Sequence, residues 1–314
     1  MKLYEILCPG GREGKMAEYI MNYGKALGFS VKRDNLGSVI CEGKESGITF
    51  ECGMDSVSFL ISAIKADGTA KIALSRGGSA AASFVGKRVC LIGGAVGVLR
   101  CGKKDEISDS DLTLDIGASS KEEAQKRISI GEVGAVLSPI EEIGEMLCGS
   151  DASRMALLEI MLSLMKELPD ISFVFSAQKS LGARGIKALS ENYETGDFIS
   201  LDTEEESEDF KMFNGVGVLI KDKGVPCRTS LCEELLALDD KAKPCISKES
   251  KATSVMDYAK GIERSGAVIL PVRGKGTEKE SVSLSDIAAA KELLRSFAKK
   301  LKQTETAEVN NGLR

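Results

Sequence analysis

The chain has 314 residues, 43% hydrophobic and 28% charged, with a net charge of −5, which is typical of a globular protein with a large core or two domains. The weak negative charge, without a dense basic run, argues against nucleic acid or an anionic membrane as a partner. No stretch reaches the roughly 18 apolar residues of a membrane span, and the N-terminal apolar run is too short for a secretory signal. Nine cysteines without regular spacing indicate reduced thiols, so we expect a cytoplasmic protein.

Histidine is absent from the whole chain. Histidine is the commonest metal ligand in proteins and the usual general base near neutral pH. Its absence excludes Ser-His-Asp and Cys-His catalysis and every zinc site that contains histidine.

The first half of the chain begins with an expected amphipathic helix, Lys15–Leu27. Two short strands follow within Phe29–Glu42, joined by a hairpin turn at Asp34–Gly37, and Ile48–Cys52 reads as a buried strand. A series of β-prone runs between Asp-Gly and Gly-Gly turns then predicts a small β-barrel or sandwich: Phe59–Ile64, Ala70–Leu74, Arg88–Ile92 and Val96–Arg100.

From Cys148 onward, helices alternate with strands. The expected elements are a buried helix at Arg154–Leu168, a strand at Ile171–Ser176, a turn and helix at Ser180–Glu191, a strand at Phe198–Leu201, a helix at Thr229–Leu238, a strand at Val268–Val272 and a final helix at Ser285–Lys302. The acidic run Glu204–Asp209 reads as a solvated loop. We therefore predict an α/β domain (residues 1–60 and 146–302) interrupted by a β-rich domain (residues 61–145), with a polar, disordered tail at residues 303–314.

Several short motifs resemble one known family over nearly the full length of the chain. They are GGREG near residue 12, DNLGS (Asp34–Ser38), DIGASSKEEA (Asp115–Ala124), AQKSLGARG (Ala177–Gly185) and SLDT (Ser200–Thr203). The DIGASSKEEA motif, in which Ser119 or Ser120 can cap a helix, is the most specific. On these motifs the chain resembles the glutamyl aminopeptidase/cellulase M family, the tetrahedral dinuclear-metal aminopeptidases.

The resemblance implies a fold, an assembly and a reaction. The fold is an aminopeptidase-like α/β/α sandwich interrupted by a small β-barrel, which helps to build dimers and then a hollow dodecamer. The family uses two divalent ions, zinc or cobalt, that polarise a peptide carbonyl and lower the pKa of a bridging water, with a Glu as the base.

Matching the family's motifs to this chain places several non-ligating residues at ligand positions. Gly53 stands where the family has its first histidine ligand, and Asp55 is the aspartate that would orient that histidine. Asp151 lies in the segment of the bridging aspartate, so either this ligand is displaced along the loop or the bridging ligand is lost. Gly276 stands where the last histidine ligand is expected.

The remaining family positions include the catalytic base. Lys179 and Ser180 occupy the places of the base and a carboxylate ligand, whereas Asp202 matches a ligand position. One carboxylate cannot hold two divalent ions, because protein metal sites need three or four ligands. We therefore expect a divergent member without catalytic residues or bound metal, in which Gly53, Asp55, Asp151, Asp202 and Gly276 line a vestigial cleft. We also predict that Lys179 pairs with Asp202, and that Asp55 caps the backbone that follows it.

The sequence also contains residues for three other kinds of site. A rebuilt metal site could use Cys52, Cys148, Asp151 and Asp202, although no CxxC-like spacing supports it. A Ser180–Lys179 dyad is disfavoured because adjacent residues of an extended segment point to opposite faces. The Gly77-Gly78 and Gly93-Gly94 pairs lack the Lys-Ser/Thr of a phosphate-binding loop.

The sequence thus predicts a non-catalytic assembly, regulatory or peptide-binding subunit of the aminopeptidase family. We expect a homo-oligomer or association with an active paralogue, with peptides as further candidate ligands. The alternative is an active metal-dependent aminopeptidase, with an unorthodox ligand set, that removes N-terminal residues from peptides.

Overall fold

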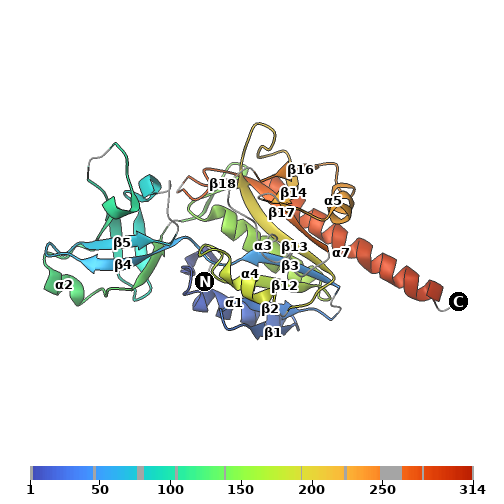
Figure 1. The fold of residues 1–314 in the computed structure, drawn as a ribbon, viewed down its shortest axis with the longest axis horizontal. Helices are drawn as coiled ribbons and strands as arrows, with labels where there is room; N and C mark the ends of the chain where they lie inside the picture. The colour runs from blue at the N-terminus through green and yellow to red at the C-terminus, as the bar shows by residue number, and fades with distance from the viewer. Residues whose placement is uncertain are drawn as a thin grey trace.

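A large α/β domain and a closed β-barrel beside it make up the structure, a computed structural model (Figure 1). The structure describes residues 3–44, 47–75, 81–102, 105–137, 139–191, 193–222, 225–247, 264–277 and 279–312. In this part of the chain, no helix is both long and apolar enough to cross a membrane.

A 12-stranded sheet forms the centre of the α/β domain. Its main path runs in the order β1-β2-β12-β3-β13-β17-β18-β11-β10, and β14, β15 and β16 branch from β17. The strands are β1 (Ser30–Arg33), β2 (Val39–Glu42), β3 (Ile48–Gly53), β10 (Glu141–Ile143), β11 (Met146–Cys148), β12 (Ser172–Ser176), β13 (Asp197–Glu205), β14 (Val216–Asp222), β15 (Val225–Pro226), β16 (Ala242–Ile246), β17 (Arg264–Arg273) and β18 (Ser281–Ser283). Strands β12, β3, β13 and β17 are parallel neighbours, so their carboxyl ends meet at one edge.

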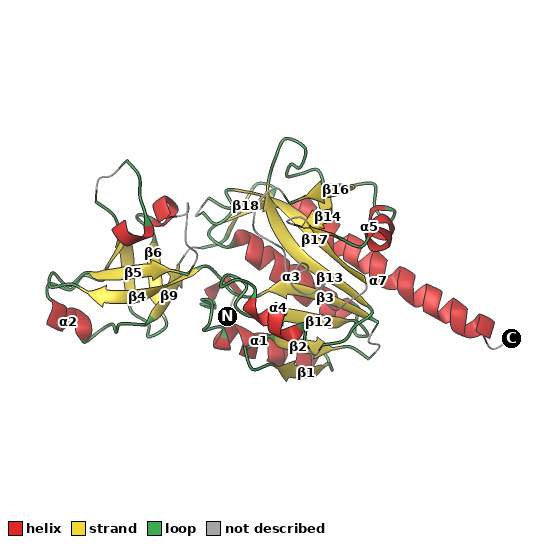
Figure 2. Ribbon diagram, viewed as in Figure 1, coloured by secondary structure: helices red, strands yellow, loops and turns green. Residues whose placement is uncertain are grey.

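Helices cover both faces of this sheet (Figure 2). They are α1 (Gly14–Ala26), α3 (Ala152–Glu167), α4 (Arg184–Leu189), α5 (Thr229–Leu236) and α7 (Leu284–Gly312). Side chains alternate along each strand, so Phe173 and Phe175 join the main core with α1, α3, α5 and α7. Val174, between them, packs instead with Ile186 of α4.

Six antiparallel strands close the barrel in the order β4-β5-β8-β7-β6-β9. They are β4 (Ser58–Ile64), β5 (Ala70–Leu74), β6 (Arg88–Leu91), β7 (Val96–Arg100), β8 (Thr113–Asp115) and β9 (Val133–Val136). The connections contain helix α2 (Lys121–Gln125) and the short 3-10 helices η2 (Ala81–Phe84) and η3 (Asp109–Asp111). Another 3-10 helix, η1 (Leu3–Glu5), lies near the N-terminus. Buried Phe59, Ile61 and Leu99 fill its own core. Ser120 caps α2 by accepting a hydrogen bond from the backbone N of Glu123, as one of the two predicted caps.

The predicted α/β fold with an inserted barrel is confirmed, but its boundaries shift. The barrel strands span residues 58–136 rather than 61–145, because β10 pairs with β11 in the large sheet. The acidic run Glu204–Asp209, predicted as a solvated loop, starts inside β13, because Glu204 and Glu205 are the last residues of that strand. The carboxylate of Glu206, the next residue, forms an ion pair with Arg273 at 2.5 Å. Helix α7 continues to Gly312 through the predicted tail, since Gln303–Asn311 contains neither Gly nor Pro.

Truncating a side chain at the centre of the sheet should cost far more stability than the same change at its edge. Ile199 of β13 is fully buried, whereas Ile143 of β10 is 55% exposed. We expect Ile199→Ala to lower the free energy of unfolding by about 2–5 kcal/mol, because a cavity remains in the core. The matched Ile143→Ala change should cost less than about 1 kcal/mol. Urea denaturation measures both, and equal losses would contradict the packing described.

Candidate functional site

The carboxyl edge of the parallel strands is the candidate site. Gly53 ends β3, Ser176 ends β12, and Asp202 lies near the end of β13. The backbone N of Met54 donates to the carbonyl of Ser176 at 3.0 Å, which ties the first two strand ends together. Open α/β sheets bind ligands at this edge, and the sequence placed its candidate residues here.

An ion pair between Lys179 and Asp202 lies at the centre of the edge. Lys179 Nζ is 2.7 Å from Asp202 Oδ2, and the two side chains are only 21% and 13% exposed. Asp202 Oδ1 also accepts a hydrogen bond from the backbone N of Thr203 at 2.8 Å. The predicted pairing is therefore present, and both carboxylate oxygens of Asp202 are engaged.

The pair keeps both partners charged despite their burial. Burial disfavours the ammonium of Lys179, but the charges of Asp202 and Glu51 outweigh that effect and raise the pKa of Lys179. Burial also disfavours the carboxylate of Asp202, yet the charges of Lys179 and Lys275 lower its pKa below the usual value. The positive charge of Lys179 thus stabilises the anion of Asp202.

Gly53 is needed for this arrangement because the Lys179 stem crosses the space beside it. A Cβ atom built on Gly53 would lie 2.3 Å from Lys179 Cδ and 2.9 Å from Lys179 Cβ. A side chain at residue 53 and the present position of Lys179 are therefore mutually exclusive.

Asp55 holds the turn that carries Lys179. Its Oδ1 accepts from the backbone N of Lys179 at 2.7 Å, and its Oδ2 accepts from the backbone N and Oγ of Ser180 at 2.9 and 2.5 Å. Gln178 and Ala183 have left-handed φ values of 56° and 55°, so the chain bends tightly here. The sequence predicted that Asp55 caps the backbone after it; it caps residues 179 and 180 instead, because the fold brings the two strand ends together.

Lys179 and Ser180 point to different carboxylates. Lys179 reaches Asp202, whereas the Ser180 hydroxyl donates to Asp55. They therefore form no nucleophile–base pair with each other.

A buried carboxyl, Glu51, lies beneath the ion pair and was missed in the sequence. Its Oε1 accepts from Ser176 Oγ at 2.5 Å and its Oε2 from Ser200 Oγ at 2.7 Å. Burial raises the pKa of Glu51 against the opposing effects of Lys179 and the two hydroxyls. A Glu in the middle of an apolar strand is the signal that could have revealed it, since glutamate is almost never fully buried without partners.

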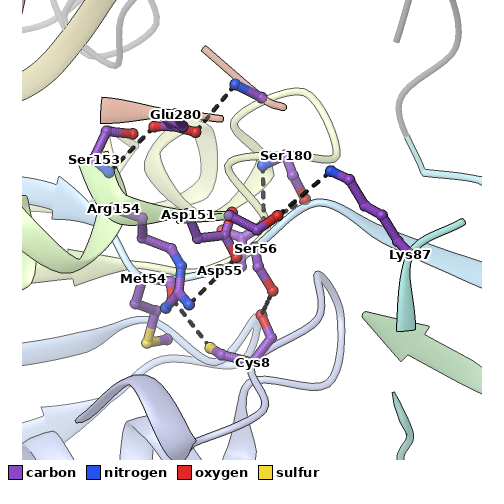
Figure 3. A network of polar contacts seen from close by, with 12 residues as sticks. Cys8, Met54, Asp55, Ser56, Lys87, Asp151, Ser153, Arg154, Ser180 and Glu280 are labelled. Atoms are coloured by element: carbon purple, nitrogen blue, oxygen red, sulfur yellow. Dashed lines mark hydrogen bonds and ion pairs between the residues drawn. The ribbon is translucent and has the colours of Figure 1, made fainter. Parts of the chain in front are cut away.

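Asp151 lies in a polar network where the barrel meets the α/β domain, and Figure 3 shows that this network also includes Asp55 and Ser180. Its Oδ2 lies 3.5 Å from Arg154 Nη2, and Arg154 Nη1 donates to the carbonyl of Met54 at 3.1 Å. Lys87 of the barrel is buried and donates to Ser150 Oγ at 3.4 Å. Burial raises the pKa of Asp151, while the charge of Arg154 opposes the rise. Arg154 and Lys87 thus offset only part of the effect of burial on Asp151.

The other predicted site residues, Gly276, Cys52 and Cys148, present no accessible charged side chain to a ligand. Gly276 has no side chain, and its backbone N donates to Glu280 Oε2 at 3.1 Å. Cys52 is fully buried, and burial raises the pKa of its thiol. The Cys148 thiol donates to Ser281 Oγ at 3.4 Å. In the described ranges no three Cys, Asp or Glu side chains are grouped so that they could hold a metal ion, so the structure does not bring Cys52, Cys148, Asp151 and Asp202 together as ligands.

Comparison with known proteins identifies the family. A sequence profile described as M42 glutamyl aminopeptidase matches residues 37–293. The chain belongs to the M42 glutamyl aminopeptidase family. A protein of Acetivibrio thermocellus with a provisional aminopeptidase name is 27% identical over 319 residues, which is 93% of this chain and 95% of that protein.

Solved structures share the M42 fold of this chain. A TET aminopeptidase from a marine sediment Thaumarchaeota archaeon superposes with a TM-score of 0.87 at 20% identity, over 95% of each chain. The TET1 peptidase of Pyrococcus horikoshii, which can assemble into a tetrahedron or a large octahedral shell, superposes with a TM-score of 0.82 at 21% identity, over 94% of this chain and 97% of that one.

The residues of this M42 chain do not fit the two divalent ions that the resemblance implies. Gly53 and Gly276 supply no side-chain ligand, and the ammonium of Lys179 is 2.7 Å from Asp202. Two unit positive charges about 4 Å apart repel by about 4 kcal/mol at an effective dielectric constant of about 20, and a dication would be repelled more strongly. Lys179 therefore opposes a metal ion at this carboxylate.

The Lys179–Asp202 pair should show energetic coupling. Lys179→Met and Asp202→Asn should each lower the free energy of unfolding by about 2–4 kcal/mol, because each strands a partly buried charge. The double variant should cost less than the sum by about 1–3 kcal/mol, whereas additive losses would contradict the pairing. Asp202 has a lowered pKa when folded, so the coupling should be complete at pH 7, decline once the pH falls below the ordinary carboxyl pKa, and vanish only below the lowered pKa of the folded state.

An exposed ion pair provides the control for this cycle. Lys32 Nζ lies 2.7 Å from Glu42 Oε1, with side chains 62% and 32% exposed. The matched Lys32→Met/Glu42→Gln cycle should give a coupling below about 1 kcal/mol.

Gly53→Ala should destabilise the protein through Lys179. The added methyl group overlaps the Lys179 stem, and we expect a loss of about 2–4 kcal/mol from overpacking and the displaced ion pair. In a Lys179→Ala background, where the stem is absent, the same change should cost clearly less. Gly14→Ala is the control, because a Cβ at Gly14 meets nothing within 4 Å. Equal costs of Gly53→Ala in both backgrounds, measured by chemical denaturation, would refute the steric argument.

Proposed function

We propose that this chain retains the M42 aminopeptidase fold without its dinuclear metal site and catalytic base, and serves as a non-catalytic subunit of a homo-oligomer. The observation that carries the proposal is the Lys179–Asp202 ion pair, whose lysine stem fills the space beside Gly53. The ammonium of Lys179 is bound to Asp202, the carboxylate that matches a metal ligand of the family. The chain has no histidine that could replace the missing ligands.

The surface of the barrel supports the homo-oligomer. Leu60 of β4 and Ile92, which follows β6, are 43% and 40% exposed. Both lie beside Val133 of β9, since Leu60 is paired with Val133 in the sheet and the backbone N of Ile92 donates to the carbonyl of Val133. Adjacent exposed apolar side chains indicate a surface that is covered in an assembly. The Pyrococcus horikoshii TET1 peptidase, which can assemble into a tetrahedron or a large octahedral shell, also supports a homo-oligomer for this chain.

We place this assembly in the cytoplasm, where it would act as a regulatory or peptide-holding subunit. All nine cysteines are free thiols, which suits a reducing compartment.

Metal content and peptidase activity test the loss of chemistry. Protein incubated with zinc, cobalt or manganese and then dialysed should retain no stoichiometric metal by elemental mass spectrometry. It should release no more amino acid from peptides than the Asp202→Asn variant does, because any metal mechanism on this scaffold would need Asp202. Metal-dependent hydrolysis that Asp202→Asn abolishes would establish the alternative, an active aminopeptidase with unorthodox ligands.

Oligomeric state tests the assembly role separately. Light scattering after gel filtration should give a mass of several times 33.4 kDa for the wild-type chain. Leu60→Asp/Ile92→Asp should shift the protein to smaller species, because burying a charge in an apolar interface is unfavourable. The double change Lys71→Asp/Arg100→Asp, on exposed polar positions of the same barrel, should leave the mass unchanged. A strictly monomeric wild-type protein would refute the assembly role.

A further inference from the structure

Two cysteines occupy paired positions at the start of α5. Arg228 is the N-cap of this helix, so Cys227 is the residue before the cap and Cys232 is the fourth residue of the helix. Residues at these two positions pack against each other in the hydrophobic staple that fixes how a chain enters a helix. The backbone N of Cys232 donates to the carbonyl of Arg228 at 3.1 Å, which closes the first turn beneath the two thiols.

Both cysteines are also anchored to the same place on β14. The backbone N of Cys227 donates to the carbonyl of Ile220 at 2.9 Å, and Cys232 Sγ donates to the carbonyl of Leu219 at 3.3 Å. The two residues are 9% and 3% exposed. Two neighbouring carbonyls of one strand thus anchor both cysteines at the same place in the core.

The two thiols differ in acidity. A hydrogen bond from the Cys227 thiol lowers the pKa of Cys232, and the same bond, together with burial, raises the pKa of Cys227. The first turn of a helix also favours a thiolate, since its unpaired N–H groups carry partial positive charge. Once Cys232 loses the proton that it donates to the Leu219 carbonyl, it is the nucleophile of the pair, and Cys227 is the thiol that keeps its proton.

We propose that Cys227 and Cys232 form a reversible dithiol–disulfide site, oxidised by a small-molecule disulfide of the glutathione type. The Cys232 thiolate attacks one sulfur of that disulfide and releases the other as a thiol. The Cys227 thiol then loses its proton and attacks the Cys232 sulfur, which releases the second thiol. The two protein thiols give up two electrons and two protons in total, and the small disulfide takes up both to become two thiols.

A third thiol makes the proposal specific. Cys245 of β16 pairs with Leu219 in the parallel ladder, and its sulfur lies over Gly217, 2.7 Å from where a Cβ would be. Cys245 is thus near the pair but on a neighbouring strand, outside the two staple positions. It provides a competing partner in the test.

The test uses native, full-length protein in buffers that range from reduced to oxidised glutathione. After an acid quench, free thiols are alkylated in denaturant, and non-reduced digests are analysed by mass spectrometry. We expect wild type and Cys245→Ser to lose two thiols each and to yield one linked peptide that joins Cys227 to Cys232. Dithiothreitol should reverse the change. Cys227→Ser should stop at a glutathione adduct on Cys232.

Hydrogen exchange provides a second readout on the same samples. Closing the bond should slow exchange of the α5 amides in wild type and Cys245→Ser, but not in Cys227→Ser. The proposal is overturned if native wild-type protein keeps all nine thiols across the whole range. It is equally overturned if the bond joins Cys245 to either residue, or if it forms only in denaturant.

Discussion

The contact between the Lys179 ammonium and the Asp202 carboxylate organises the carboxyl edge of the sheet. Asp55 fixes the backbone from which Lys179 projects, and Gly53 leaves the space through which its stem passes. Glu51 adds a second carboxyl below the ammonium. Glu51, Gly53 and Asp55 occupy alternate positions at and just beyond the end of β3, whereas Lys179 and Asp202 come from two other segments that the folded sheet brings beside them. A cation supplied by the protein itself balances carboxyl groups that would otherwise repel one another.

The fold does not depend on the chemistry at this edge. Apolar alternation builds the parallel strands, and a separate cluster of buried side chains fills the barrel. Buried apolar side chains make up both cores. A sequence can therefore keep the M42 architecture while its strand ends change, which is why function has to be argued from the site rather than from the fold.

Local patterns in the sequence predicted most of this architecture. The Asp34–Gly37 hairpin, the β-prone runs of the barrel and the buried helix before β12 were all correct, because periodicity and turn residues act over a few positions. The Lys179–Asp202 pair followed from charge balance at matched motif positions. Glu51 and the true partners of Asp55 were missed, since these contacts join strand ends that only the folded sheet brings together. The assignment of β10 to the large sheet likewise depends on long-range pairing with β11 and β18.

The most direct test of the account is anomalous diffraction at the zinc edge from crystals grown with excess zinc. We expect the Lys179 ammonium to remain at hydrogen-bonding distance from the Asp202 carboxylate in these crystals. We also expect no anomalous peak between the strand ends at Gly53 and Asp202. Two ordered peaks within about 2.0–2.3 Å of protein atoms there, with the Lys179 ammonium displaced, would contradict it.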